Sequence, residues 1–155
     1  MGTFLDLAQM PQFKNIKILL VTPSDPKEYL ANLEKDLAGR IICEVGKSIS
    51  QIDFCAGDLH LYPANPGANS RFAEGVSINV LEMACLGVPS LITKGGAETW
   101  PELVDLGMIT EVDWSNLEAV AKIIEQDFTR PSITAIEQSR AIIDVGKNID
   151  FLLRK

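Results

Sequence analysis

The residues with the clearest potential for chemistry are two glutamates, Glu74 and Glu82, that enclose the start of an expected helix. Gly75 and Ser77 stand at the mouth of that helix, where backbone N–H groups without helical partners and the positive end of the helix dipole face outward. Such a terminus favours an anionic group, and a diphosphate is the most natural candidate. The segment therefore predicts a site for a phosphate-bearing ligand at the amino end of this helix.

Glu82 raises a separate question, because it lies within the expected helix beside its apolar side. We expect Ile78, Leu81 and Cys85 to form the buried stripe of this helix. An ionised carboxylate beside an apolar face is unfavourable unless it is hydrogen-bonded, so Glu82 needs a protein partner or the hydroxyl groups of a ligand. The simpler interpretation is that Glu82 lies at the edge of the stripe and is solvated.

Three other sets of residues match the motifs of phosphate loops, catalytic sites and metal sites less well. Gly46-Lys47-Ser48 has the setting of a nucleotide phosphate loop, but Ile41 stands where that motif needs a first glycine, and Ser48 is better explained as a helix N-cap. His60 is the only histidine and alternates with leucines along an expected strand, which indicates a satisfied structural histidine. One histidine and three cysteines without CxxC spacing also disfavour metal sites and Ser–His or Cys–His catalysis.

Strand-like and helix-like segments alternate along the chain and would position these residues. Five segments have the apolar runs or the alternation of strands: 16–21, 40–43, 58–62, 88–93 and 108–110. The expected helices begin near Asp25, Ser48, Ser77, Ser115 and Ser132, and the last one runs towards Leu153. Three of these starts carry the sequence of a capping box: Asp25 with Glu28, Ser48 with Gln51, and Ser115 with Glu118.

This alternation predicts parallel pairing through right-handed crossovers. We therefore expect an α/β fold, an open parallel sheet with helices on both faces. Ligands of such sheets bind beyond the carboxyl ends of the strands. In this chain those ends lead into the loops 44–46, 63–76 and 94–101.

The composition indicates a packed domain and limits the range of partners. The 155 residues are 46% hydrophobic and 23% charged, so we expect a single domain over 1–155. A net charge of −7 and a pI of about 4.7 argue against binding to nucleic acid. We see neither a signal peptide nor an apolar stretch approaching the ~20 residues of a transmembrane helix, and therefore expect a soluble, cytoplasmic protein.

Three blocks of sequence, 58–63, 74–89 and 95–102, together resemble the carboxy-terminal domain of retaining glycosyltransferases. The group concerned is the glycogen-synthase-like, or group 1, family, whose members have the two-domain GT-B fold. The resemblance covers the chain from about Phe4 to about Ile124. Its most specific part is the pair of glutamates separated by seven residues, followed by a helix of small residues and Gly87-Val88-Pro89. It implies a Rossmann-like sheet that forms one half of a GT-B fold.

The resemblance also implies a role for each motif residue. Glu74 would be the catalytic residue that accepts hydrogen bonds from the hydroxyls of the transferred sugar. Glu82 would hold the ribose hydroxyls of the nucleotide, which supplies partners for its carboxylate. The amides that would face the diphosphate and sugar are those of Gly75, Val76 and Ser77. Negative charge builds on the departing diphosphate, so fixed N–H donors there would lower the barrier.

Further binding residues follow from the same resemblance. Glu44 and Val45 would meet the nucleotide base through their backbone. In the family a preceding strand and loop supply an Arg and a Lys that clamp the diphosphate, and we expect this chain to begin after them. Arg71 and Lys94 are the available replacements, and the simpler interpretation is that both are solvated surface charges. The family generally works without a metal, so we expect none and no other cofactor.

These features predict the donor-binding domain of a glycosyltransferase, which transfers a sugar from a nucleotide diphosphate sugar to an unknown acceptor with retention. Alone it should bind donor weakly and transfer nothing, because an amino-terminal acceptor domain or a partner subunit must hold the acceptor. One alternative is a non-catalytic binding or interaction module derived from this fold. Another is a different GT-B enzyme, such as a sugar-nucleotide epimerase.

Overall fold

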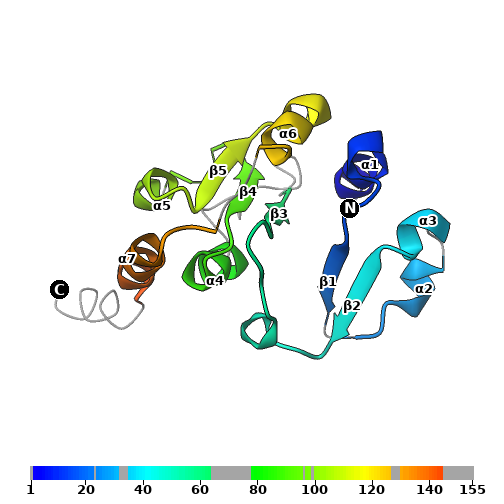
Figure 1. The fold of residues 1–155 in the computed structure, drawn as a ribbon, viewed down its shortest axis with the longest axis horizontal. Helices are drawn as coiled ribbons and strands as arrows, with labels where there is room; N and C mark the ends of the chain where they lie inside the picture. Colours follow the sequence, from blue (N-terminus) through cyan, green and yellow to red (C-terminus); the bar gives the residue numbers. More distant parts are fainter. Residues whose placement is uncertain are drawn as a thin grey trace. The chain divides into compact units, whose positions relative to one another are not determined.

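Parallel strands, divided between two sheets, form the framework of the chain (Figure 1). The structure is a computed structural model that describes residues 2–22, 24–31, 35–63, 78–95, 97–98, 100–126 and 130–144. The chain divides into two compact units, Met1–Asp53 and Phe54–Lys155, and each contains one of the sheets. The α/β class with parallel strands is therefore confirmed, whereas the single domain over 1–155 stays a prediction.

The first unit is built on two strands, β1 (Ile18–Thr22) and β2 (Ile41–Val45), which pair in parallel with Ile18 opposite Ile41. Its helices are α1 (Gly2–Gln9), α2 (Lys27–Leu30) and α3 (Lys35–Ala38), with 3₁₀ turns at Pro11–Phe13 and Ile49–Gln51. A small core joins α1, β1 and α3 through the buried side chains of Ala8, Ile18 and Leu37.

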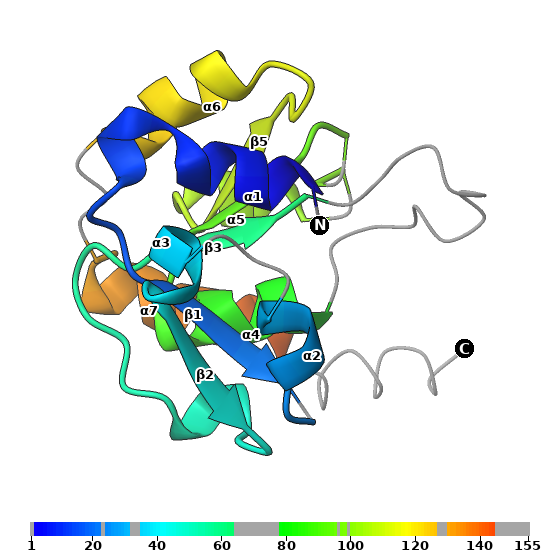
Figure 2. The same ribbon diagram turned by 90° about the vertical axis from the view of Figure 1, so that its right-hand side faces the viewer.

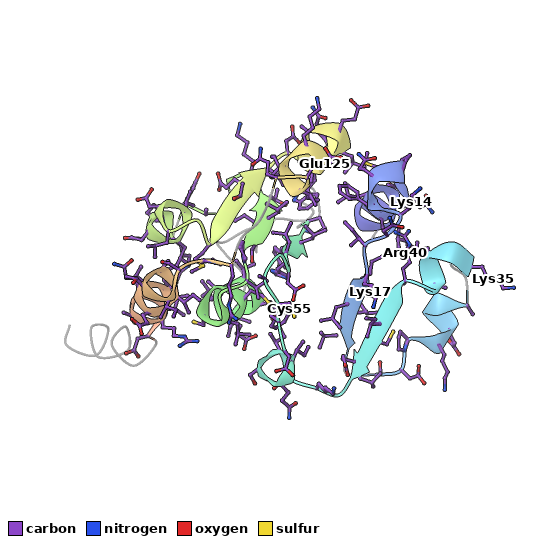
Figure 3. The ribbon with its side chains drawn as sticks, in the orientation of Figure 1. Lys14, Lys17, Lys35, Arg40, Cys55 and Glu125 are labelled. Atoms are coloured by element: carbon purple, nitrogen blue, oxygen red, sulfur yellow. The ribbon has the colours of Figure 1, made fainter. Side chains whose placement is uncertain are left out.

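Arg40 ties the helical start of the first unit to its sheet (Figure 3). One guanidinium nitrogen donates to the carbonyl of Phe13 at 2.7 Å, and the other donates to the carbonyl of Ala8 at 2.8 Å. Both carbonyls belong to the end of a helical segment, where backbone acceptors lack partners within the helix. A planar guanidinium presents several donors in a fixed geometry and can satisfy two such carbonyls at once.

The second unit is a three-stranded parallel sheet in the order β3-β4-β5. Its strands are β3 (His60–Tyr62), β4 (Ser90–Thr93) and β5 (Ile109–Val112). Its helices are α4 (Ile78–Leu86), α5 (Pro101–Asp105), α6 (Leu117–Ile124) and α7 (Ile133–Ile143). Figures 1 and 2 show α4 and α7 on one side of this sheet and α6 on the other.

The core of the second unit lies between this sheet and the helices packed on it. Its buried members are Val80, Ala84, Ile92, Ala97, Leu103, Met108, Ile109 and Ile136. The α4–α7 contact is close at Gly87, where a Cβ atom would come within 2.5 Å of Ile136 Cδ1. Gly87 also has a φ of +76°, so this position both ends α4 and needs a residue without a side chain.

Each observed strand falls on a predicted segment with small shifts at its ends, the start at Ser48 with its capping box is confirmed, and the predicted N-cap at Ser115 is wrong. The residues after Ser48 form only a single 3₁₀ turn, although the Gln51 side chain accepts from the Ser48 amide at 2.9 Å as in a capping box. The N-cap of α6 is Asn116, one residue after the predicted Ser115. Ser115 instead donates its hydroxyl to Asp113 at 2.6 Å, because the chain turns there before the helix begins.

Candidate functional site

The carboxyl ends of β3, β4 and β5 meet at one edge of the second sheet, because the three strands are parallel. At this edge the amide of Lys94, directly after β4, donates to the carbonyl of Val112 at the end of β5 at 3.0 Å. Ligands of parallel α/β sheets bind beyond such an edge. The structure therefore places Lys94 where the sequence predicted a binding residue.

The loop that follows β4 is held against β5 by a carboxylate. The Ala97 amide donates to Glu111 Oε1 at 2.7 Å, and Ala97 itself is buried. Gly95, between the strand end and this contact, has a φ of +83° and lets the chain turn. Trp100 closes the loop with a hydrogen bond from its amide to the Ala97 carbonyl at 2.8 Å, and its ring packs on the core.

The Lys94 ammonium shares this edge with a carboxylate. Hydrogen bonds from the Ser115 side chain and backbone lower the pKa of the exposed Asp113, and the charge of Lys94 lowers this pKa further. Lys94 is itself exposed and faces water as well as Asp113. An exposed cation of this kind contributes little to stability, so its position is governed more by the loop that carries it than by its attraction to Asp113.

The buried face of α4 differs from the predicted one. Val80, Met83 and Ala84 are buried, whereas Ile78 is 72% exposed. The predicted stripe is therefore wrong at Ile78, whereas Leu81 packs against the core and Cys85 is half-buried. Nearly every residue of α4 is apolar, so helical spacing in the sequence allows more than one apolar stripe, and packing against the sheet and α7 selects another.

This correction also changes the interpretation of Glu82. Its side chain is exposed, so its carboxylate does not need a ligand to compensate for burial, and the solvated interpretation from the sequence fits the structure. Burial raises the pKa of the neighbouring Cys85 thiol, with the positive charge of Arg140 opposing and the negative charge of Glu82 adding to that effect. The thiol is therefore not activated.

Five predicted site residues lie outside the described residues. They are Arg71, Glu74, Gly75, Val76 and Ser77. Glu44 and Val45 belong to the first unit, at the carboxyl end of β2. Glu44 makes an ion pair of 2.7 Å with Lys47, and Val45 is exposed beside Gly46, which has a φ of +70°. The backbone after β2 thus turns sharply at the place where the sequence predicted base contacts.

His60 is a structural histidine, in agreement with the expectation from the sequence. Its Nδ1 lies 3.0 Å from the Ser90 hydroxyl, and its ring centroid lies 6.1 Å from that of Tyr62. Burial lowers the pKa of His60 to about 4, so the ring is neutral near pH 7. Because Ser90 is completely buried, this pair has no access to a substrate carbonyl.

A hollow of about 450 Å³ lies elsewhere in the second unit, between α5 and α7. Its lining consists of Glu102, Asp105, Leu106, Gln138, Ala141 and Ile142. This lining includes none of the predicted site residues. Two of the lining side chains are carboxylates, which repel a diphosphate, so the strand edge remains the candidate site.

Glu111 is the residue at this site that the sequence did not indicate. Its place in Ile109–Val112, between a polar threonine and a buried valine, is typical of a solvated residue on an edge strand. Its contact with Ala97 depends on the parallel register that sets Ile92 opposite Glu111, which local sequence does not reveal.

Comparison of the chain with protein-family models, curated proteins and solved structures gives no significant match. Within the described part of the chain, no helix has both the length and the apolar character needed to cross a membrane. The same residues contain no group of three or more histidine, cysteine or acidic side chains placed to hold a metal ion.

Proposed function

We propose that this chain is the nucleotide-sugar-binding domain of a retaining glycosyltransferase of GT-B type. The observation that carries the proposal is the loop after β4, which is held at the carboxyl edge of a parallel sheet by Val112 and Glu111. This is the edge where α/β sheets bind nucleotides. Along the chain, the segment that contains the two spaced glutamates comes before β4 and this loop. The resemblance to the glycogen-synthase-like family supports the assignment.

In the proposed site each residue keeps the role that the resemblance implies. Glu74 accepts hydrogen bonds from the transferred sugar, and the amides of Gly75, Val76 and Ser77 face the diphosphate. Glu82 accepts hydrogen bonds from the ribose, and its exposure leaves the carboxylate accessible to a ligand. Amides fixed before the reaction stabilise the charge that develops on the leaving diphosphate, and this requires no metal ion.

Cations complete the proposed diphosphate site. Lys94 lies at the strand edge and its side chain is exposed to solvent. We assign it, together with Arg71, to the clamp that the family builds from residues of a preceding strand. Glu44 and Val45 supply backbone groups for the base. Transfer itself needs an acceptor held opposite the donor, by a second domain or a partner subunit.

A non-catalytic interaction module is the second candidate, and an exposed apolar pair in the first unit favours it. Leu19 and Ile42 stand opposite each other in the register of β1 and β2, and they are 40% and 44% exposed. Parallel sheets are normally covered on both faces, so an exposed apolar pair is a feature expected of a surface that meets a partner.

Calorimetric titration with UDP, GDP and ADP, in the presence of a chelator, distinguishes the two functions. The matched variants are Glu82→Ala and Glu137→Ala, since both remove an exposed glutamate from the middle of a helix in the second unit. We expect saturable binding of one nucleotide, lost in Glu82→Ala and retained in Glu137→Ala. Absence of binding to all three nucleotides at millimolar concentration would contradict the donor-domain function.

A further inference from the structure

We infer that Glu111 is a positioning residue, which fixes the loop after β4 and thereby places the Lys94 side chain for an anionic ligand. This inference rests on the proposed function, because the ligand is the diphosphate of the donor. Glu111 itself is not assigned any contact with that ligand. Its effect reaches Lys94 through its contact with Ala97.

The first support is the geometry of two anchoring contacts. The Lys94 amide bonds to the Val112 carbonyl at 3.0 Å, and the Ala97 amide bonds to the Glu111 carboxylate at 2.7 Å. Both acceptors belong to consecutive residues of β5, so the start and the far end of this short segment are fixed to one strand. Gly95, with a φ of +83°, provides the turn between the two anchors. A residue anchored in this way has little freedom left to lose when a ligand binds.

The second support is the burial of the amide that Glu111 satisfies. Ala97 is 4% exposed and belongs to the core of the second unit, so its N–H has little access to water. A buried donor without an acceptor is unfavourable, and a bond to a carboxylate is shorter and stronger than a bond to a neutral oxygen. Removing the Glu111 side chain therefore releases the loop rather than leaving it in place with an unsatisfied amide.

The third support is the sign of the charge at this edge. A carboxylate near a diphosphate repels it, and Asp113 already places one negative charge beside Lys94. A second acidic residue at the same edge is therefore unfavourable for binding unless it serves another purpose. Holding the Ala97 amide is such a purpose, and it requires an acceptor oxygen but not a negative charge.

Two variants of Glu111 are therefore expected to differ in loop order and in anion affinity. Glu111→Gln keeps an acceptor oxygen at the same position and removes the charge, so it should preserve the loop and bind an anion as well as wild type or better. Glu111→Ala removes the acceptor and should release the loop. Glu118→Ala, which removes an exposed glutamate from the first turn of α6, serves as the control for a general change in charge.

The test uses the ¹⁵N-labelled full chain, with amide exchange measured before ligand is added and inorganic pyrophosphate and UDP titrated afterwards. We expect exchange at Ala97 to be at least about 10-fold faster in Glu111→Ala, with affinity for both probes about 10-fold weaker, while Glu111→Gln and Glu118→Ala match wild type. Circular dichroism establishes that each variant is folded, and the glutamine variant keeps the test valid if the alanine variant is not.

Several results would overturn the inference. Unchanged Ala97 exchange in Glu111→Ala would show that the contact does not hold the loop. Faster exchange with unchanged affinity would make Glu111 a purely structural residue. If wild type binds neither probe, the proposed function fails and the ligand role of Glu111 fails with it, while the exchange data still report whether the contact with Ala97 forms.

Discussion

Acidification is predicted to destabilise the second unit through His60. Burial lowers the pKa of this histidine from 6.5 to about 4 in the folded chain. As the pH falls below 6.5, the unfolded chain binds a proton at His60 that the folded chain does not bind until about pH 4. The free energy of unfolding therefore falls through this interval, and the contribution of neutral His60 is fully present only above pH 6.5.

The size of this loss of stability follows from the two pKa values of His60. A pKa lowered from 6.5 to about 4 corresponds to about 3 kcal/mol at about 1.4 kcal/mol per pKa unit, and the part lost between pH 7 and pH 5 is about 2 kcal/mol. Carboxylates titrate in the same range, so the measurement needs a variant that removes only the histidine. His60→Gln retains an amide that can bond to the Ser90 hydroxyl but takes up no proton.

Urea unfolding at pH 7, pH 6 and pH 5 provides the assay. Relative to His60→Gln, the wild-type chain should lose about 2 kcal/mol across this range. Because the sequence contains one histidine, its imidazole resonances can be followed without ambiguity in the folded chain. Equal losses of stability in the two proteins, or a folded-state titration of His60 near pH 6.5, would refute the reasoning.

Three further predictions concern packing, anchoring and thiol reactivity. Gly87→Ala should lower the free energy of unfolding by about 2 kcal/mol or more, because Gly87 has a positive φ and a Cβ there would approach Ile136. Gly107 has a φ of +70° but open space around it, so Gly107→Ala should lower this free energy by only about 1 kcal/mol. Thermal melts of both variants test this, and equal losses would contradict it. Arg40→Ala should speed amide exchange across the first unit by about 10-fold or more, because the Ala8 and Phe13 carbonyls both lose their bond from the guanidinium. Unchanged exchange would argue against this anchor. Burial raises the pKa of the Cys85 thiol, so Cys85 should react with iodoacetamide more slowly than the exposed Cys55. Mass spectrometry of the alkylated peptides measures the two rates, and faster labelling of Cys85 would contradict its packing.

The strands and their parallel pairing could be predicted because the evidence for them is local. Runs such as Ile18–Thr22 and Ser90–Thr93 are apolar and lie between helical segments, and this alternation leaves few topologies open. The orientation of α4 could not be predicted in the same way. Its apolar residues surround the helix axis, so only its packing against the sheet and α7 determines that Val80 is buried and Ile78 is exposed.

The candidate site shows the same division between local and tertiary information. Lys94 could be singled out because it follows a predicted strand directly. Glu111 could not, since its partner Ala97 is distant in the sequence and meets it only through the register of β4 and β5. The prediction of the N-cap of α6 was wrong for a different reason. Ser115 and Asn116 are both good capping residues, and the turn at Asp113 decides between them.

The most direct test of the central claim is to map amide chemical-shift changes in the labelled chain while UDP, GDP and ADP are added in turn. A donor-binding domain predicts saturable changes for one nucleotide at Lys94, Gly95 and Ala97, at the carboxyl edge of the sheet of the second unit. Changes confined to the hollow between α5 and α7, or no change with any nucleotide at millimolar concentration, would contradict the claim that this chain binds a nucleotide sugar beyond its strand ends.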